Sequence, residues 1–176
     1  MTNVIIKSKN PEFILRHVTK NDAQGYFESM YSPEAKKGFM STPQNLKEAK
    51  KKIQEYISQT KRGMVEPFTI EVNGQYAGYV ELHDLGKEHF KHRAYIGYCL
   101  HPNFRGKGIM TEAVKLVSSY AFKKYKLKRL EAYCRTFNKP SAKVLKKSGF
   151  KLEGILRKNK CKDGKYLDDM VWAIVK

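Results

Sequence analysis

The sequence predicts an α/β fold in which helices cover both faces of a mixed, mostly antiparallel sheet of about seven strands. Runs of apolar, aromatic and β-branched residues have the length of strands, and they alternate with stretches of helical periodicity. The chain has 176 residues, of which 41% are hydrophobic, and it contains neither an internal repeat nor a linker-like segment. We therefore expect one domain, residues 1–176, with a substantial hydrophobic core.

The first elements expected are a strand over residues 13–16 and a helix over about residues 22–30. Thr19 and Asp22 have the spacing of a capping box, with aspartate in place of the usual glutamate, so they should open this helix. Ser32 and Pro33 should close it, because proline lacks the N–H group that a helix interior needs.

Residues 42–82 should form a second helix followed by a β-hairpin. Thr42 and Pro43 are expected to start the helix, which runs to about residue 60. Residues 68–72 and 75–82 are predicted to pair as strands, because the dipeptide of residues 73 and 74, Asn-Gly, is typical of a tight hairpin turn. The inward face of the helix would carry Leu46, Ile53 and Ile57.

The second half of the chain is expected to continue this alternation, and its last two strands should pair around Asp163 and Gly164. The expected elements are a strand over residues 94–100, a helix beginning near residue 109, a strand over 130–134, a helix over 139–148, and strands over 150–157 and 166–175. The buried face of the first of these helices would carry Met110, Ala113, Val114, Val117 and Ala121.

A turn with two glycines, Arg105-Gly106-Lys107-Gly108, joins the strand over residues 94–100 to the helix that follows. No Ser, Thr, Asp or Asn occupies the cap position, so the first backbone N–H groups stay free at the positive end of the helix dipole. A phosphate or pyrophosphate would fit there, and Arg105 and Lys107 would add full charges. The glycine pair alone is equally compatible with a plain tight turn. Its spacing matches neither G-x-x-x-x-G-K-(S/T) nor G-x-G-x-x-G.

The run from Ile96 to Ala113 resembles the coenzyme A signature (R/Q)-x-x-G-x-(G/A) of the GNAT acetyltransferases; Arg105 and Gly108 match, and Met110 replaces the final small residue. Residues 138–150 are similar to the segment N-x-x-S-x-x-(V/L)-L-x-K-x-G-F of the RimJ/RimL-like branch, which acetylates the N-termini of ribosomal proteins. Two motifs in the family's order are more specific than either alone. The resemblance runs from about residue 13 to the C-terminus. It implies the GNAT fold, acetyl-CoA as cosubstrate and a protein N-terminal amine as acceptor.

The resemblance also implies roles for single residues. Asn138 would bond the pantetheine arm of coenzyme A, and Ser141 would lie near the thioester sulfur. The two are about 60° apart around a helix axis, so both can face one cleft. A structural role is open for each, Asn138 as the helix N-cap and Ser141 as a first-turn serine that bonds its own backbone. The residues expected at the cofactor are Cys99, Leu100, Arg105, Gly106, Lys107, Gly108, Ile109, Met110 and Asn138.

Acetyl transfer needs a neutral amine, a polarised thioester carbonyl and a proton or hydrogen bond for the departing thiolate. The resemblance makes Ser141 the catalytic candidate for the last role. Leu145 stands where many GNAT members carry a tyrosine general acid, so that acid is missing here. Glu81 and His83 are the candidate bases, because alternate residues of a strand share one face, and a water chain to Glu81 would suffice. Tyr95 stands where related sequences often have glutamate.

The net charge of +18 predicts a field that attracts anions such as coenzyme A and that could hold the protein near RNA or a ribosome. The same field should disfavour polycationic acceptors such as polyamines and aminoglycosides. Solvated helix faces and turns are the favoured interpretation of the lysine-rich runs at residues 47–52, 123–129 and 157–162. A small-molecule amine acetyltransferase, a coenzyme A-binding regulator without turnover and an RNA-binding module remain open alternatives.

Three cysteines without C-x-x-C spacing argue against a disulfide framework and against a zinc site, so no metal is expected. Cys99 and Cys134 should be small buried hydrophobes rather than nucleophiles. Residues 1–7 carry too short an apolar run for a signal peptide, and no later run reaches transmembrane length. We therefore expect a cytoplasmic protein without membrane contact. The sequence leaves the oligomeric state open, a homodimer included.

Overall fold

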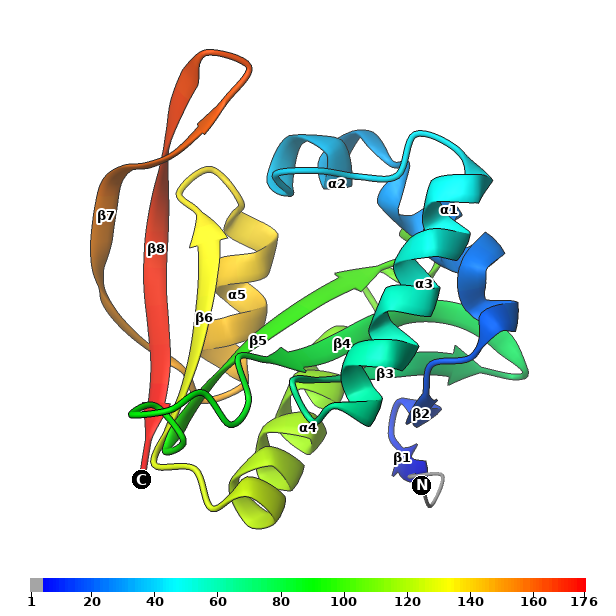
Figure 1. Ribbon diagram of the computed structural model, residues 1–176, viewed down its shortest axis with the longest axis horizontal. Helices are drawn as coiled ribbons and strands as arrows, with labels where there is room; N and C mark the ends of the chain where they lie inside the picture. Colours follow the sequence, from blue (N-terminus) through cyan, green and yellow to red (C-terminus); the bar gives the residue numbers. More distant parts are fainter. Residues whose placement is uncertain (1–4) are drawn as a thin grey trace.

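The structure is a computed structural model that describes residues 5–176, and within them eight strands form one sheet (Figure 1). The strand order is β1-β2-β3-β4-β5-β6-β8-β7, and only the β5–β6 pair among these neighbours is parallel. The expected mixed, mostly antiparallel sheet is thereby confirmed. The strands are β1 (Ile5–Lys9), β2 (Glu12–His17), β3 (Val65–Val72), β4 (Gln75–His83), β5 (Arg93–Leu100), β6 (Arg129–Arg135), β7 (Lys151–Lys162) and β8 (Lys165–Val175).

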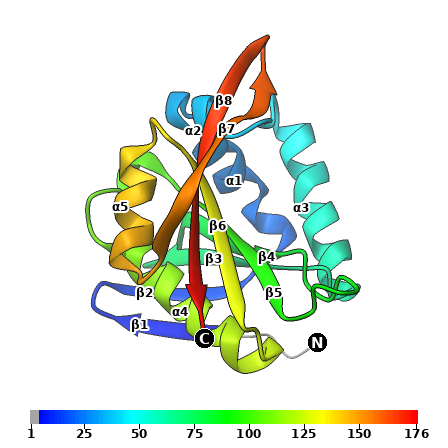
Figure 2. The same ribbon diagram turned by 90° about the vertical axis from the view of Figure 1, so that its left-hand side faces the viewer.

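Helices cover both faces of this sheet, as expected, and Figure 2 shows α5 and α3 on opposite sides of the strands. One hydrophobic core lies between the sheet and the pair α4 and α5, and a second lies between the sheet and α1 to α3. Each helix buries one apolar stripe against the strands. The helices are α1 (Ala23–Met30), α2 (Pro33–Gly38), α3 (Leu46–Lys61), α4 (Ile109–Tyr125) and α5 (Lys139–Lys147).

The turn and periodicity predictions that rest on strong local signals are confirmed. Asn73 and Gly74 join β3 to β4 with φ angles of 49° and 76°, the left-handed conformation that a tight hairpin turn requires. Asp163 and Gly164 join β7 to β8 with φ angles of 50° and 72°. The buried face of α4 contains the expected Met110, Ala113, Val114, Val117 and Ala121.

The predicted start of the second helix at Thr42 and Pro43 is wrong, because α3 begins at Leu46. Asn45 is the cap, and its side-chain oxygen accepts a hydrogen bond from the backbone N–H of Glu48 at 3.0 Å. That bond satisfies a first-turn N–H group directly. A capping side chain therefore sets the start of this helix more strongly than the proline before it.

Two elements go beyond the sequence prediction. Ser32 and Pro33 close α1 as expected, but they also open the short helix α2, whose first turn is capped by the Ser32 hydroxyl accepting from the Ala35 N–H at 3.3 Å. The strand β1 pairs with β2 along its whole length. Residues 1–4, part of the segment in which no signal peptide was expected, lie outside the described residues.

Cys99 and Cys134 are buried as predicted, Cys99 in the second core and Cys134 in the first, while Cys161 is exposed. Across residues 5–176, no helix has the length and apolar character needed to cross a membrane. Over the same residues, His, Cys, Asp and Glu side chains form no group of three or more that could hold a metal ion.

The parallel strands β5 and β6 part soon after they meet. They pair at three positions only, from Arg93 with Arg129 to Tyr95 with Glu131. Beyond that point β5 stays paired with β4 as far as Leu100, and β6 stays paired with β8. Figure 1 shows the two strands diverging towards the ends that carry their arrowheads. The sheet therefore contains a gap between the last halves of β5 and β6.

A buried carboxylate fixes the second half of α4 to the sheet. Glu66 on β3 is only 2% exposed, and it accepts hydrogen bonds from Tyr120, Lys124 and Tyr125 of α4 at 2.7, 2.7 and 2.5 Å. His17 Nε2 lies 3.1 Å from the same carboxylate. Burial alone would raise the pKa of Glu66, but the hydrogen bonds together lower it to about 2.

We expect Glu66→Gln to lower the free energy of unfolding near pH 7 by roughly 3 kcal/mol, because the partly buried His17, Tyr120 and Tyr125 and the more exposed Lys124 would lose the buried carboxylate that they share. The folded pKa of Glu66 is below its ordinary value of 4.5, so this stabilisation is present above about pH 4.5 and disappears as the pH falls towards 2. Urea unfolding at about pH 7 and pH 3 should show a large and then a reduced difference from the wild type. Glu55→Gln, at a side chain that is 44% exposed, is the control, and an equal loss at both pH values would contradict the assignment.

Candidate functional site

The glycine turn between β5 and α4 has the open backbone that the sequence predicted. Gly106 and Gly108 have φ angles of 80° and 77°, in the left-handed region that favours glycine. An added Cβ at either position would meet nothing within 4 Å. Lys107 between them is exposed. The surface of this turn is therefore backbone, and a ligand can approach it closely.

The first residues of α4 present backbone donors and not side chains, and Glu112, which is also in the first turn, lies 3.9 Å from Lys115 Nζ. Gly108 is the N-cap residue, and it supplies no side-chain hydrogen bond to the helix. Ile109 and Met110 are 3% and 6% exposed, and their side chains pack in the first core. They could contact a ligand only through their N–H groups. Together with the helix dipole, these groups suit an anion such as a pyrophosphate.

Arg105 is not a free cation at this turn, because its guanidinium is already hydrogen-bonded to other groups of the protein. Its guanidinium donates to the Leu100 carbonyl at 3.3 Å, to Glu34 Oε2 at 3.1 Å and to Ser32 Oγ at 3.4 Å. Arg105 thus ties the turn to α2. Glu34 is 67% exposed, so the ion pair is weak enough to exchange for a stronger anion.

Cys99 and Leu100 on β5 can contact a cofactor through their backbone. Cys99 is 7% exposed, and its thiol lies 3.7 Å from the Ser29 carbonyl. Burial raises the pKa of the Cys99 thiol to about 12, although Arg105 and Ser29 oppose that shift, so the thiol stays protonated. Leu100 packs against the first core. Both residues belong to the part of β5 that β6 has left.

Asn138 and Ser141 lie together at the start of α5. The Asn138 side-chain oxygen accepts from the Ser141 N–H at 3.2 Å, so the predicted N-cap role is confirmed. The Ser141 hydroxyl does not follow the alternative of a bond to its own backbone, since its partner is the Tyr98 hydroxyl at 2.9 Å. Leu145, one turn later, is fully buried in the first core.

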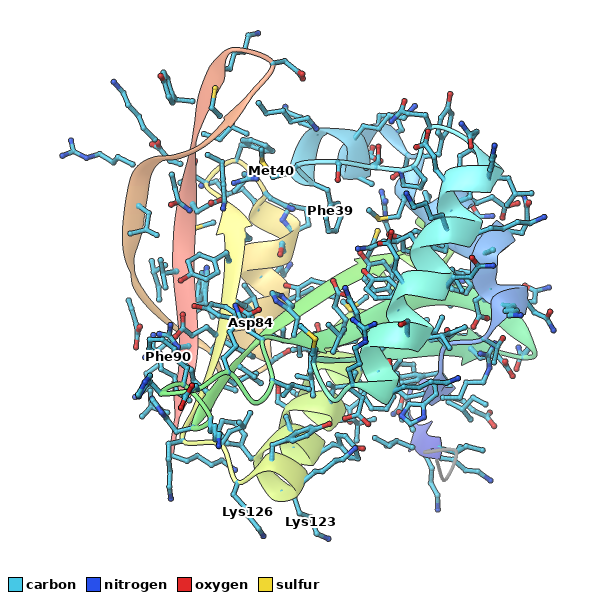
Figure 3. The ribbon with its side chains drawn as sticks, in the orientation of Figure 1. Phe39, Met40, Asp84, Phe90, Lys123 and Lys126 are labelled. Atoms are coloured by element: carbon cyan, nitrogen blue, oxygen red, sulfur yellow. The ribbon has the colours of Figure 1, made fainter. Side chains whose placement is uncertain are left out.

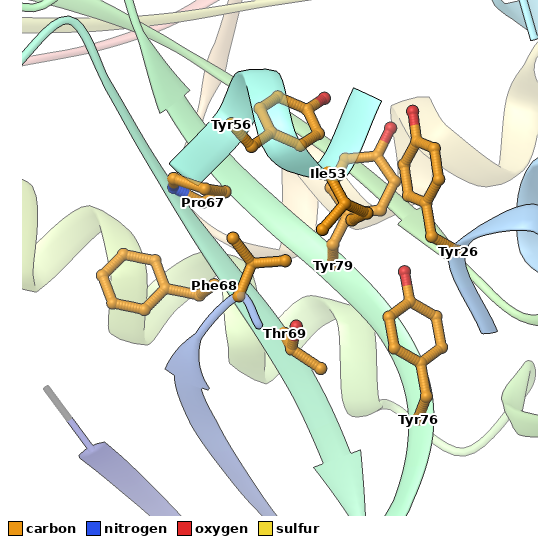
Figure 4. Close-up of a pocket in the computed structure, with 9 residues that line it drawn as sticks. Tyr26, Ile53, Tyr56, Pro67, Phe68, Thr69, Tyr76 and Tyr79 are labelled. Atoms are coloured by element: carbon orange, nitrogen blue, oxygen red, sulfur yellow. The ribbon is translucent and has the colours of Figure 1, made fainter. Parts of the chain in front are cut away.

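Glu81 lies on the other face of the sheet, with the second core. It pairs with Gly97 of β5, where a Cβ would come within 3.1 Å of Glu81 Oε1, so glycine leaves room for the carboxylate. Burial raises the pKa values of Tyr26, Tyr56 and Tyr79, and the Glu81 charge raises them further. Figure 4 shows these three tyrosines around a small internal pocket between β3, β4, α1 and α3. Glu81 therefore faces phenol groups that remain protonated.

The two catalytic candidates are not in contact. Val80 and Leu82, the neighbours of Glu81 on β4, pack in the first core, so Glu81 points to the opposite face from α5 and Ser141. Only through the gap between β5 and β6 could both act on one molecule. His83 is engaged by stacking on Tyr95, with ring centroids 5.5 Å apart.

Beside the gap, the sheet face that carries Glu81, which we call the open face, is lined by aromatic rings and by paired charges. Tyr95 lies 5.6 Å from Tyr133, ring to ring. Arg135 of β6 binds Asp169 at 2.6 Å, and it also reaches the Gly38 carbonyl at 3.2 Å and the Met40 sulfur at 2.9 Å. Figure 3 labels Met40 and Phe39 beside α2, above the gap between β5 and β6. Arg135 thus holds the end of α2 above the gap.

Sequence reasoning missed Tyr98 and Arg135. Tyr98 lies in an apolar strand, where a tyrosine is indistinguishable from an ordinary core residue. Arg135 is one of 35 lysines and arginines, and its partners are 34 and 97 positions away in the chain. No local pattern could have singled out either residue.

Known proteins are similar to this chain in sequence. The family model for the acetyltransferase (GNAT) domain matches residues 12–151. Among the relatives is an uncharacterized N-acetyltransferase of Bacillus subtilis, YoaA, which is 31% identical over 166 residues, 93% of each chain. A probable N-acetyltransferase of the same organism, YjcK, is 51% identical over 82 residues, but that match spans 47% of this chain and 45% of YjcK. The spermidine N(1)-acetyltransferase of Escherichia coli strain K12 is 32% identical over 99 residues, 56% of this chain and 52% of that protein.

Solved structures share the fold. RimL, a ribosomal alpha-N-protein acetyltransferase, has in its apo form a TM-score of 0.87 and 23% identity, covering 100% of this chain and 96% of that one. RimL in complex with coenzyme A has a TM-score of 0.84 and 25% identity, covering 98% of each chain.

We expect Gly108→Glu to lower the affinity for coenzyme A by roughly 100-fold or more, because it adds bulk and a negative charge where the pyrophosphate would lie. Gly74→Glu is the matched control: Gly74 also has a positive φ angle, 76°, and open space around it, but it lies in the β3–β4 hairpin. Both variants should lose similar stability, and calorimetric titration should show weakened binding only for Gly108→Glu. Unchanged affinity in that variant would exclude the turn from the site.

Proposed function

The chain belongs to the GNAT acetyltransferase family, and from this premise we propose that it transfers the acetyl group of acetyl-CoA directly to the N-terminal amine of a protein. Acetyl-CoA is the cosubstrate of this family, and RimL has been solved with coenzyme A. The observation that carries the proposal is the bare backbone of Gly106 and Gly108 beside the gap between β5 and β6.

The proposal assigns the binding of coenzyme A to both sides of this gap. The N–H groups at the start of α4 would hold the pyrophosphate, with Lys107 adding charge. Asn138 would bond the pantetheine arm through the part of its amide that the N-cap does not use. The backbone of Cys99 and Leu100 has no strand partner on its β6 side and would bond the arm as a strand would, with the Leu100 carbonyl giving up its present bond from Arg105.

The chemistry would divide between the two faces of the sheet. A neutral amine attacks the thioester carbon, and Glu81 takes up the proton of the amine through water. Backbone N–H groups in the gap polarise the carbonyl oxygen. The C–S bond then breaks with its electron pair on sulfur, and the Ser141 hydroxyl offers a hydrogen bond to the thiolate.

The charges on the open face favour a peptide amine over a polyamine. Asp84 is paired with Lys87 at 2.9 Å, and Asp169 with Arg135 at 2.6 Å. Glu131 accepts from Arg129 at 2.7 Å. These carboxylates are thus neutralised, so the field of the +18 chain acts against polycations there. The same field would keep the enzyme near a ribosome or RNA, where ribosomal proteins are found.

We expect kcat/KM for a neutral N-terminal peptide to exceed that for spermidine or an aminoglycoside. The reason is the repulsion of polycations, so the difference should shrink as salt screens the field. Release of coenzyme A thiol, followed with a thiol-detecting reagent over a panel of peptides and polyamines at low and high salt, measures it. Comparable kcat/KM for spermidine at low salt would favour the small-molecule alternative that the spermidine acetyltransferases suggest. If the protein binds coenzyme A but acetylates no amine, the proposal that it is an enzyme is wrong.

We expect Ser141→Ala to lower kcat by about 100-fold while changing the KM for acetyl-CoA little, because a hydrogen bond to the developing thiolate acts mainly in the transition state. Ser148→Ala is the matched control, since its hydroxyl bonds the Thr111 carbonyl at 3.0 Å at the other end of α5. That variant should lose stability and keep its kcat. Normal kcat with a lowered melting temperature in Ser141→Ala would make Ser141 a structural residue.

A further inference from the structure

Tyr98 is the side chain that fixes the Ser141 hydroxyl. It leaves β5 on the face of α4 and α5, beyond the last residue at which β5 pairs with β6. Its hydroxyl lies 2.9 Å from Ser141 Oγ and 3.2 Å from the Ser141 carbonyl oxygen. The two residues are 43 positions apart in the sequence, and their contact links β5 directly to α5. The orientation of the serine therefore depends on a tyrosine from another element.

The hydrogens of the two hydroxyl groups allow two arrangements. If the Tyr98 hydroxyl donates to Ser141 Oγ, the hydrogen of the serine is free to donate to a third group. If the serine donates to Tyr98 instead, the tyrosine hydrogen turns to the Ser141 carbonyl, and the serine has no hydrogen left to offer. A thiolate beside Ser141 selects the first arrangement, because a charged acceptor makes the stronger bond. In a chain of hydrogen bonds, the tyrosine then strengthens the serine as a donor.

The surroundings keep Tyr98 in its donor form. Burial raises the pKa of the Tyr98 phenol well above its ordinary value, against a smaller lowering by Ser141, so the hydroxyl stays protonated through the neutral pH range. Cys134 lies near Ser141 and Trp172; burial raises the pKa of its thiol, and these two neighbours lower it by less. The cysteine therefore adds no negative charge that would compete for the serine hydrogen.

We propose that Tyr98 is a positioning residue that turns the hydrogen of Ser141 towards the coenzyme A sulfur, a role that rests on the function proposed above. In the transfer step the N–C bond forms, the C–S bond breaks, and its electron pair goes to sulfur. The proton of the amine passes to water and Glu81. The sulfur leaves as a thiolate that Ser141 holds by a hydrogen bond, and it takes its proton from solvent. Tyr98 itself loses no proton.

The kinetic test is Tyr98→Phe, which removes the hydroxyl and keeps the ring. We expect kcat to fall about tenfold, the equivalent of one hydrogen bond, with the KM for acetyl-CoA within about twofold of the wild type. Because Tyr98 acts through Ser141, the double variant Tyr98→Phe/Ser141→Ala should be no slower than Ser141→Ala alone. A tyrosine with a purely structural role would instead lower the melting temperature and add its effect to that of Ser141→Ala.

A second readout needs no acceptor. The thiol of bound coenzyme A, titrated by the ultraviolet absorbance of the thiolate, should ionise at a lower pH than free coenzyme A. That shift should be smaller in Tyr98→Phe and smallest in Ser141→Ala. Tyr120→Phe is the matched control, because it removes a phenol hydroxyl that bonds Glu66 at 2.7 Å, outside the gap. The control should match the wild type in kcat and in thiol ionisation.

Two results would overturn the role of Tyr98. One is wild-type thiol ionisation in Tyr98→Phe, and the other is a double variant slower than Ser141→Ala by the full factor of the single tyrosine variant. Failure of the proposed function looks different: the wild type would acetylate none of the peptides. The thiol titration would then still decide whether Tyr98 acts on Ser141, since it requires only bound coenzyme A.

Discussion

The short parallel contact between β5 and β6 is the constraint on which the site depends. Three paired positions hold the strands together at one end, and β4 and β8 hold each strand along its outer side. The inner backbone groups beyond Tyr95 consequently lose the partners that a continuous sheet would supply. An extended ligand that offers its own donors and acceptors can replace them. In the proposed function the gap binds coenzyme A for the same reason that it is a break in the sheet.

Side chains on both faces of the sheet link the elements on the two sides of this gap and so hold them in place. Tyr98 spans from β5 to the start of α5 on one face. On the other, Arg135 and Lys162 donate to backbone carbonyls of the α2 segment and its end. Some of the positive charge thus has a structural role. Lys123 and Lys126 are solvated surface charges, which point away from the far end of α4 in Figure 3. Lys124 differs from them, because it is bound to the buried Glu66.

Local signals predicted most of the fold and the outline of the site. Asn73 with Gly74 required a tight turn whatever lay around it, and Gly106 with Gly108 required an open one. The start of α3 was missed because two capping signals stand close together, and the Asn45 side chain, which accepts from the Glu48 N–H, sets the start in place of Thr42 and Pro43. In the same way the sequence could show that Arg105 carries a charge at the turn, but not that Glu34 holds it, since that contact joins residues 71 positions apart.

The separation of Glu81 from Ser141 was beyond sequence reasoning for a related physical cause. Alternation along β4 tells which residues share a face, but it does not tell on which face α5 will pack. With the base candidate on the side of α1 and α3 and the sulfur donor on the side of α5, the proposed reaction needs the acetyl group inside the gap. An amine would then enter from the open face while the thiolate leaves towards α5. Because Glu81 and Ser141 lie on opposite faces of the sheet, this arrangement would keep the carboxylate and the thiolate apart. Tyr98 would then act only on the departing thiolate, through the orientation of Ser141.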